Sequence, residues 1–330
     1  MISKIPVILC VDTEPNEIFI DPSSPLPWTG FEAGVRYFRG LEAPVEISTK
    51  SPLHVSWFFR MDAQIEKTYG SASWAVENYS GAIDTLVKRG DELALHTHGY
   101  RWDEGLFAWV IDHGNWEAIR HSIELSFKAY KKVFGKNCRS FRFGDRWMNA
   151  QSIALLERLG VLYDLTPEPG YGSSPTLRGN SPFTGVIPDY TDFPRTPYRP
   201  SLSDLKKPDT SKKEGLWFIP LSTGAVRHPY AKRHQLFYSI FNPAKLASFN
   251  LALHMELDPD FFWQVVDGLL QTLPAPYLAF GTRSHIFLSK EKMRNIDRNF
   301  EILFTRAKTT PFFFATPAEA MKILEDHVDR

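Results

Sequence analysis

Acidic and imidazole side chains occur where apolar runs of this sequence end. The run Ile5–Val11 leads into Asp12 and Glu14, and the run Glu92–His96 leads into a second histidine, His98. Later apolar runs also end in or near titratable residues, namely Arg142, Asp145, Arg146, Asp164, His254, Glu256 and Asp258. Carboxylates and imidazoles that gather at one edge of a fold are suited to bind a divalent metal ion. These residue types therefore favour metal-assisted chemistry.

The spacing within the two leading pairs supports the same interpretation. Successive side chains of an extended strand point to opposite faces, so residues two apart point to the same face. Asp12 and Glu14 would share one face of their strand end, and so would His96 and His98. One such pair alone is more often a coincidence than a ligand set. It is the occurrence of both, at two strand ends, that indicates a site.

The elements that must position these residues alternate between strands and helices. Apolar runs predict strands at Ile5–Val11, His54–Met61, Glu92–His96, Ser140–Phe143, Val161–Leu165, Leu216–Leu221, Asn250–His254, Tyr277–Thr282 and Phe312–Ala315. Helical spacing predicts helices at Ala75–Arg89, Trp116–Phe134, Ala150–Leu159, Phe261–Leu273, Lys290–Lys308 and Pro317–His327. Such alternation favours a parallel β/α architecture, whose active sites form at the carboxyl ends of the strands. We expect one barrel domain over residues 1–330.

The stretch Thr166–Gly215 interrupts this alternation. It is rich in Pro, Gly, Ser and Thr, and long loops in compact domains are usually either functional or disordered. We expect an irregular insertion that crosses the barrel mouth and covers the site. In that case Asp189, Tyr190, Asp192 and Tyr198 could contact the substrate. The alternative is a disordered surface loop.

Composition excludes several classes of partner. Lys+Arg and Asp+Glu both number 38 in the 330 residues, so net charge favours neither nucleic acid nor an anionic membrane. The two cysteines, Cys10 and Cys138, are too few for a disulfide framework, and Cys10 is expected to be a buried thiol. No apolar stretch approaches the roughly 20 residues that span a bilayer, and the first residues lack signal-peptide features. The sequence predicts a cytoplasmic protein and indicates no particular oligomeric state.

Five ordered motifs, taken together, resemble those of the polysaccharide deacetylases of the NodB-homology group (carbohydrate esterase family 4). They are the acidic segment Val11–Pro15, the glycine-acid turn and histidine run Arg89–Tyr100, the Phe-Arg segment Ser140–Gly144, the pair Tyr163–Asp164, and the strand Leu251–His254. The segment Phe313–Ala320 is similar to the last strand and helix of that family. The resemblance extends over nearly the whole chain, and the histidine run is its most specific part. It implies an irregular (β/α) barrel of the NodB-homology type.

The resemblance also implies a divalent metal, with zinc preferred, bound by Glu14 or Asp12 together with His96 and His98. Two positions depart from the family pattern. Many members have adjacent aspartates in the first motif, whereas Thr13 separates the two acids here. Many also have the second histidine ligand four residues after the first, where this sequence has Tyr100. Either His98 or Tyr100 therefore fills the place of that ligand.

The activity implied by the resemblance is hydrolysis of an N-acetyl group on an amino sugar. Asp12 would be the general base, oriented by Arg142, and Asp164 matches the fourth motif. His254 would be the general acid, with His285 as a competing candidate. Two structural alternatives remain: Arg142 and Asp164 could form an ion pair under the rim, and His254 could cap the following helix.

The expected cytoplasmic location favours a nucleotide- or lipid-linked saccharide precursor of a surface polysaccharide, such as lipopolysaccharide, as the substrate. Two other functions remain open. The first is a degenerate, non-catalytic barrel that binds a saccharide or a protein partner. The second is a metal hydrolase that removes another acyl group, either O-acetyl or formyl.

Overall fold

Strands of one curved, parallel sheet form the centre of the protein, whose computed structural model describes residues 4–174, 183–227 and 248–328. The sheet contains β1 (Ile5–Thr13), β2 (Ser56–Arg60), β3 (Glu92–Thr97), β6 (Ser140–Phe143), β7 (Tyr163–Asp164), β11 (Trp217–Phe218), β14 (Leu278–Arg283) and β15 (Phe312–Phe314). Its order is β11-β7-β6-β3-β2-β1-β14, with β15 also on β1, and each of these pairings is parallel. The expected irregular β/α barrel is thus confirmed, as a curled half-barrel.

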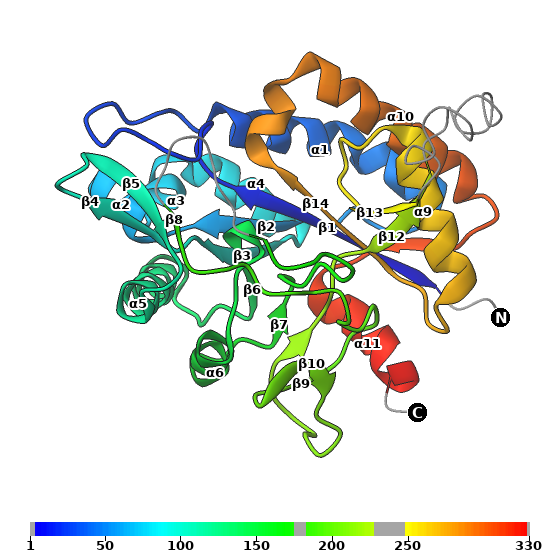
Figure 1. Ribbon diagram of the computed structural model, residues 1–330. Coiled ribbons are helices and arrows are strands. Elements are labelled where there is room, and N and C mark those ends of the chain that lie inside the picture. Colours follow the sequence, from blue (N-terminus) through cyan, green and yellow to red (C-terminus); the bar gives the residue numbers. More distant parts are fainter. Residues whose placement is uncertain (1–3, 175–182, 228–247, 329–330) are drawn as a thin grey trace, which may run out of the picture.

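Helices surround this sheet (Figure 1). They are α1 (Thr29–Thr49), α2 (Ala63–Tyr69), α3 (Trp74–Asn78), α4 (Ser80–Arg89), α5 (Trp116–Phe134), α6 (Ala150–Arg158), α9 (Pro259–Thr272), α10 (Lys290–Arg306) and α11 (Pro317–Val328). Two short 3-10 turns, η1 (Gly144–Arg146) and η3 (Ser284–Leu288), follow β6 and β14. α4 and α5 pack on β3, and α11 packs on β1. Among the described residues, no helix combines the length and apolar character needed to cross a membrane.

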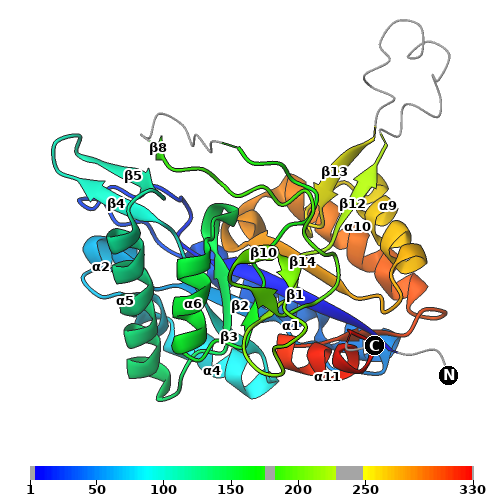
Figure 2. The same ribbon diagram turned by 60° about the horizontal axis from the view of Figure 1, so that its bottom comes forward.

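Smaller sheets flank the half-barrel. β4 (Tyr100–Asp103) and β5 (Ala108–Asp112) form an antiparallel hairpin, with β8 (Phe183–Thr184) beside β5. β9 (Pro200–Ser201) pairs with β10 (Asp204–Pro208), and β12 (Thr223–Val226) pairs with β13 (Phe249–Ala252). β12 and β13 lie beside α9 (Figure 2). The long 166–215 segment therefore contains short strands as well as irregular backbone.

The predicted strand Asn250–His254 differs from the expectation. Its residues form β13, which is antiparallel to β12 and lies outside the main sheet. His254 nevertheless makes an isolated parallel bridge with Gly281 of β14. The end of this segment therefore still reaches the edge of the half-barrel.

The helix α1 has no counterpart among the predicted elements. Pro44 lies inside it, and an interior proline normally argues against a helix because it removes a hydrogen bond and clashes with the preceding turn. The buried face of α1 offsets this cost, since Phe38 packs edge-on against Phe287 of η3. The predicted helix Ala75–Arg89 is also divided at Tyr79, between α3 and α4.

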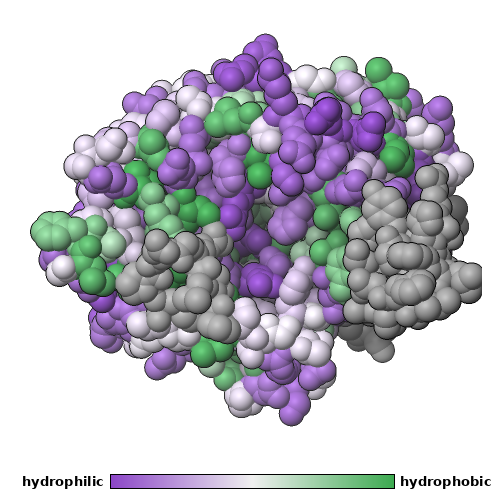
Figure 3. Space-filling model, turned by 45° about the horizontal axis from the view of Figure 1, so that its top comes forward, coloured by the Kyte–Doolittle hydropathy of each residue, from purple (hydrophilic) through white to green (hydrophobic). Residues whose placement is uncertain are grey.

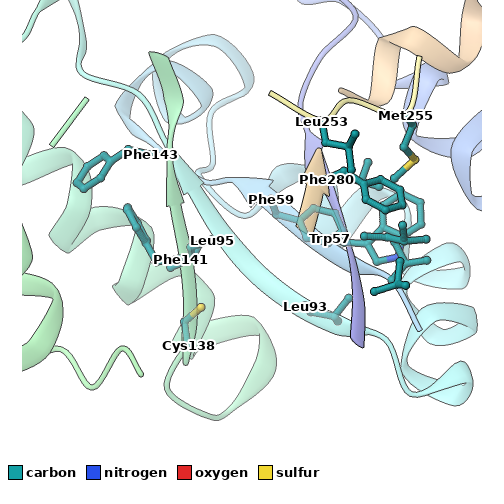
Figure 4. Close-up of a cluster of buried hydrophobic side chains, with 14 of the residues drawn as sticks. Trp57, Phe59, Leu93, Leu95, Cys138, Phe141, Phe143, Leu253, Met255 and Phe280 are labelled. Carbon is teal, nitrogen blue, oxygen red and sulfur yellow. The ribbon is translucent and has the colours of Figure 1, made fainter. Parts of the chain in front are cut away.

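Alternation along the strands separates two hydrophobic layers. Figure 4 shows part of the larger one, to which β2, β3 and β6 each contribute residues two apart: Trp57, Phe59, Leu93, Leu95, Phe141 and Phe143. The intervening residues face the interior of the half-barrel, where Ile8, Cys10, Phe58 and Ala94 form a second cluster. Cys10 is a buried free thiol, as expected, and so is Cys138. Toward the carboxyl ends of the strands, the residues of this inner face become polar.

Candidate metal centre and active site

The predicted site residues continue the inner face of the half-barrel to its rim. Asp12 and Glu14 have the same parity as Cys10 on β1, and His96 and His98 have the parity of Ala94 on β3. The alternation that buries apolar residues lower in the barrel therefore brings these polar residues together at its carboxyl end. A depression with hydrophilic walls is visible on one face of the molecule (Figure 3).

The rim encloses a pocket of about 430 Å³. Its walls combine acids, four histidines and three arginines with a few other residues: Asp12, His96, His98, Arg142, Phe143, Gly144, Asp145, Arg146, Glu168, Tyr171, His254, Glu256, Thr282, Arg283, His285 and Ile286. Binding pockets of this size usually hold a small molecule. The pocket is therefore the candidate active site.

Glu14, His96 and His98 form a cluster of metal-ligand type, the only such group of three or more among the described residues. One ligand atom from each lies within 4.8 Å of the others. The two histidine Nε2 atoms are 3.0 Å apart, and His98 Nε2 lies 3.5 Å from Glu14 Oε2. All three side chains are buried.

The second ring nitrogens show why the two Nε2 atoms can face each other. His96 Nδ1 lies 3.0 Å from the carbonyl oxygen of Arg142, which only accepts hydrogen bonds, so this Nδ1 carries the proton. His98 Nδ1 lies 3.1 Å from Asp145 Oδ2 and donates to that carboxylate in the same way. Both Nε2 atoms then present lone pairs toward the same point. A cation at that point relieves the repulsion between them, and this donor set fits a metal ion.

The electrostatics of Glu14 and His96 agree with a ligand role. Burial raises the pKa of Glu14, but contact with His98 and the charges of Arg283 and Arg60 outweigh burial and lower the pKa. Neither Glu14 oxygen has a hydrogen-bond partner among the described residues. Burial lowers the pKa of His96 to about 4, so its imidazole is neutral at pH 7. An ionised carboxylate and two neutral imidazoles are the ligands that zinc prefers.

Asp12 lies beside this cluster and pairs with Arg142. Arg142 Nε donates to Asp12 Oδ1 at 3.1 Å, Nη1 donates to the Leu165 carbonyl at 2.7 Å, and Nη2 donates to Glu168 at 3.3 Å. Burial raises the pKa of Asp12, but Arg142 and then His96 outweigh it, and the pKa is lowered. The Asp12 carboxylate is therefore ionised and fixed in direction.

Asp164 lies below this pair and does not line the pocket. Its Oδ1 accepts a hydrogen bond from the Thr166 amide at 2.7 Å. The ion pair between Arg142 and Asp164, considered above as a structural alternative, is not found among the described residues, because Arg142 pairs with Asp12 and Glu168 instead.

His254 and His285 both line the pocket, from different connections. His254 does not cap α9, because Asp258 is the N-cap of that helix. A Cβ added at Gly281 would lie 3.9 Å from both His254 Nδ1 and Arg142 Nη2. His254 and Arg142 therefore both border Gly281 of β14, whereas His285 is in η3.

The 166–215 segment contributes residues other than those proposed from the sequence. Glu168 and Tyr171 line the pocket, whereas none of the four candidates does so: Asp189, Tyr190, Asp192 and Tyr198. Tyr190 and Tyr198 are buried, with hydroxyls bonded to backbone carbonyls. The Tyr190 ring packs against Phe193 and the Tyr198 ring against Phe218 of β11. The structure therefore does not bring these four residues into the pocket wall, and contact between them and a substrate stays a prediction.

Several other site residues were not predicted, and two of them left a signal in the sequence. Arg60 ends β2 with the inward parity of Phe58, and its guanidinium lies 3.8 Å from Glu14. Strand alternation could have identified it. Arg283 likewise ends β14 with the inward parity of Ala279 and pairs with Asp12. Glu168 follows no such pattern, because it belongs to an irregular segment.

Comparisons with known proteins identify the fold. The sequence matches no family model and no curated protein. A protein from Parabacteroides distasonis that is assigned as a glycoside hydrolase/deacetylase has a similar structure. Its TM-score is 0.56 at 13% identity, with coverage of 98% of this chain and 72% of that chain. For PuuE allantoinase the TM-score is 0.52 at 12% identity, with coverage of 99% of this chain and 92% of that chain. For the 4-alpha-glucanotransferase of Thermococcus litoralis the TM-score is 0.50 at 14% identity, with coverage of 97% of this chain and 40% of that chain.

These identities show a shared fold and nothing finer, since one fold supports many activities. The arrangement of strands and helices is that of a NodB-type (β/α) barrel, which the similar glycoside hydrolase/deacetylase shares. This chain has that deacetylase fold, as its sequence motifs suggested.

Proposed function

We propose that this protein is a metal-dependent hydrolase that removes an N-acetyl group from an amino sugar. The observation that carries the proposal is the cluster of Glu14, His96 and His98 next to an ionised Asp12, where His96, His98 and Asp12 line the pocket and Glu14 is buried behind its wall. A deacetylase-type fold supports it. A metal alone would fit many hydrolases, but a fixed carboxylate beside the ligand cluster also provides a base.

Each residue has a role that follows from its contacts. Asp12 accepts the proton of the attacking water, and Arg142 holds the carboxylate in the ionised form and in one orientation. Glu14, His96 and His98 would hold the metal, which when bound supplies Lewis acidity toward the carbonyl oxygen and the water. Asp164 lies below the reacting groups and supports them through Thr166.

His254 donates the proton that the leaving amine requires. An amide nitrogen is a poor leaving group without that proton. We prefer His254 to His285 because His254 borders Gly281 together with Arg142, and hence lies close to the proposed base. The alternative is tested by paired variants, His254→Ala and His285→Ala. A loss of turnover confined to His285→Ala would transfer the role to that residue.

The substrate that we propose is a saccharide, with a nucleotide- or lipid-linked precursor of a surface polysaccharide as its finer definition. The walls of the pocket are rich in hydrogen-bonding side chains, which suit sugar hydroxyls. The size of the pocket, about 430 Å³, suits a small number of sugar units. A cytoplasmic location and zinc as the metal belong to the same proposal.

The decisive experiment combines elemental analysis with a panel of acylated compounds. Protein purified without chelator should contain about one equivalent of metal, as one cluster requires, and should release acetate from N-acetylated amino sugars, free or linked to nucleotide or lipid. O-acetylated and N-formylated sugars test the other acyl groups. Allantoin is included because one protein of this fold is an allantoinase. A metal-loaded protein that hydrolyses none of these would favour a non-catalytic saccharide-binding barrel.

A further inference from the structure

The turn that follows β6 contacts His98, one of the proposed metal ligands, at the ring nitrogen that faces away from the metal site. Asp145, in η1, has a side chain that is fully buried. Its Oδ2 lies 3.1 Å from His98 Nδ1 and 3.0 Å from the hydroxyl of Tyr100. The tyrosine ring also packs against the His98 ring, with centroids 4.4 Å apart. The imidazole is therefore fixed on its Nδ1 edge and on one face.

The backbone of this turn adopts an uncommon conformation. Asp145 and Arg146 have φ angles of 55° and 58°, both in the left-handed region. Residues with a side chain adopt this region at a cost of roughly 1–2 kcal/mol, although aspartate and asparagine tolerate it best. Two such residues in succession persist only where the surroundings hold them in place. Here the conformation directs the Asp145 carboxylate back toward β3.

Gly144 permits the close approach of the turn to His98. A Cβ added to this glycine would lie 2.2 Å from the nearest atoms of the His98 ring, well inside van der Waals contact. The ring therefore lies directly on the glycine backbone. The three residues Gly144, Asp145 and Tyr100 together form a socket around His98, which we call the His98 socket.

The two histidines of the cluster are held differently. His96 donates to a neutral backbone carbonyl, that of Arg142, whereas His98 donates to a carboxylate. A carboxylate partner fixes the tautomer, orients the ring and raises the basicity of the coordinating nitrogen. His98 should therefore depend on its partner side chain more than His96 does.

We propose that Asp145 is a positioning residue, which sets the Nδ1-protonated tautomer and the orientation of His98, and that Tyr100 completes its hydrogen bonding. The inference rests on the metal centre of the proposed function. In this view Tyr100, which occupies the place of a histidine ligand in many similar proteins, stabilises the ligand without binding the metal. The His98 socket allows the shorter His-x-His spacing to function.

The test measures metal affinity in the full-length chain, without any substrate. Zinc affinity is determined by competition with a chromophoric chelator for the parent, Asp145→Asn, Asp145→Ala and Tyr100→Phe. Removal of such a partner typically weakens metal affinity by about 10- to 100-fold, and we expect Asp145→Ala to fall in that range. Asp145→Asn should lose less, because asparagine tolerates the left-handed backbone and retains an accepting oxygen. Tyr100→Phe should lose least.

A matched control comes from the other end of β3. Asp91 is also a buried carboxylate, and it accepts hydrogen bonds from Arg89 and Trp57. Asp91→Asn removes a buried charge far along the strand from His98, and zinc affinity should not change. The absorption spectrum of the cobalt-substituted protein provides a second measurement, which should change in the Asp145 variants and not in Asp91→Asn.

The possible outcomes distinguish a failure of the proposed Asp145 role from a failure of the proposed metal-dependent function. If the parent binds zinc and Asp145→Ala binds it equally tightly with an unchanged cobalt spectrum, Asp145 has no positioning role. If Asp145→Ala does not fold, the same comparison holds for Asp145→Asn and Tyr100→Phe, which conserve shape. If the parent itself binds neither zinc nor cobalt, the proposed metal centre is wrong, and the inference falls with it.

Discussion

The two sides of the pocket are built in different ways. On the side of β1, β3 and β6, the functional side chains lie on regular parallel strands or directly after them, and they are buried in contact with one another. On the side of β14, His254 follows an antiparallel strand and His285 lies in a 3-10 turn, and both are partly exposed. The difference suggests that the rigid side holds the metal and the base, whereas the looser side delivers the proton and admits the substrate.

The largest expected effect follows from removing a ligand on the rigid side. His96→Ala should abolish metal binding and reduce turnover to the background rate, since two remaining ligands bind zinc weakly. His285→Ala is the matched variant on the looser side and should retain the full metal content. Elemental analysis after dialysis measures both. Equal retention of metal by the two proteins would contradict the division of roles between the two sides.

Asp12→Asn should give the next largest effect. A general base contributes about 10²–10⁴-fold, and the turnover number should fall by that amount. Because Asp12 lies outside the ligand cluster, the metal content should stay at the parental level. Arg142 retains Glu168 as a partner, so the fold should persist, as checked by circular dichroism. Loss of metal in this variant would instead make Asp12 a ligand.

The same comparison explains how much of the molecule could be predicted from the sequence. On the rigid side, alternation along a strand is a local pattern, and it placed Asp12, Glu14, His96 and His98 on one face correctly. The 166–215 segment has no such period. Its Pro- and Gly-rich backbone packs by tertiary contacts, and its pocket residues, Glu168 among them, could not be separated from its buried ones.

The elements of the fold also divide into those that local sequence patterns define and those that tertiary packing defines. The helix α5 and the strand β6 have the predicted bounds, because amphipathic spacing and a closing glycine define them locally. Helix α1 was missed, since packing of Phe38 against Phe287 outweighs the effect of Pro44. The residue roles, and the expectation of one domain over the whole chain, stay predictions.

Stability should depend on pH through Asp164. Burial raises the pKa of this carboxyl from 3.8 to about 7, against smaller opposing effects of Thr166 and Arg142. Between those values the folded state holds a proton that the unfolded state has released, so stability falls as pH rises from about 4 to 7 and then levels off. The substitution Asp164→Asn keeps a side-chain oxygen that can accept the hydrogen bond from the Thr166 amide, and it removes the titrating carboxyl group.

Urea unfolding of the parent and of Asp164→Asn at several pH values from 4 to 8 measures this effect. The difference between the two unfolding free energies should change by a few kcal/mol in favour of the variant as pH rises, since one pKa unit corresponds to about 1.4 kcal/mol. Parallel curves for the two proteins would show that Asp164 titrates near its usual pKa. The measurement needs no substrate, so it tests the buried residues next to the pocket independently of catalysis.

The smallest expected effect concerns the contribution of the 166–215 segment to the looser side. The Tyr171 hydroxyl accepts a hydrogen bond from the Ala252 amide at 2.7 Å, which ties the segment to β13, and the Arg146 guanidinium lies 4.5 Å from the centre of the Tyr171 ring. The substitution Tyr171→Phe keeps the aromatic ring and removes the hydrogen bond to the Ala252 amide. A single hydrogen bond contributes about 1 kcal/mol to stability, so its loss should raise KM by no more than about fivefold, with kcat and metal content near parental values.

Asp192→Ala is the matched control within the same segment. The Asp192 side chain is 79% exposed and lies outside the pocket lining, so its removal should leave KM unchanged. The comparison uses whichever acetylated sugar the panel identifies as the best substrate. A raised KM for Asp192→Ala with a parental KM for Tyr171→Phe would mean that substrate meets the outer surface of the segment. Substrate selection would then depend on the part of the chain that this structure places away from the pocket.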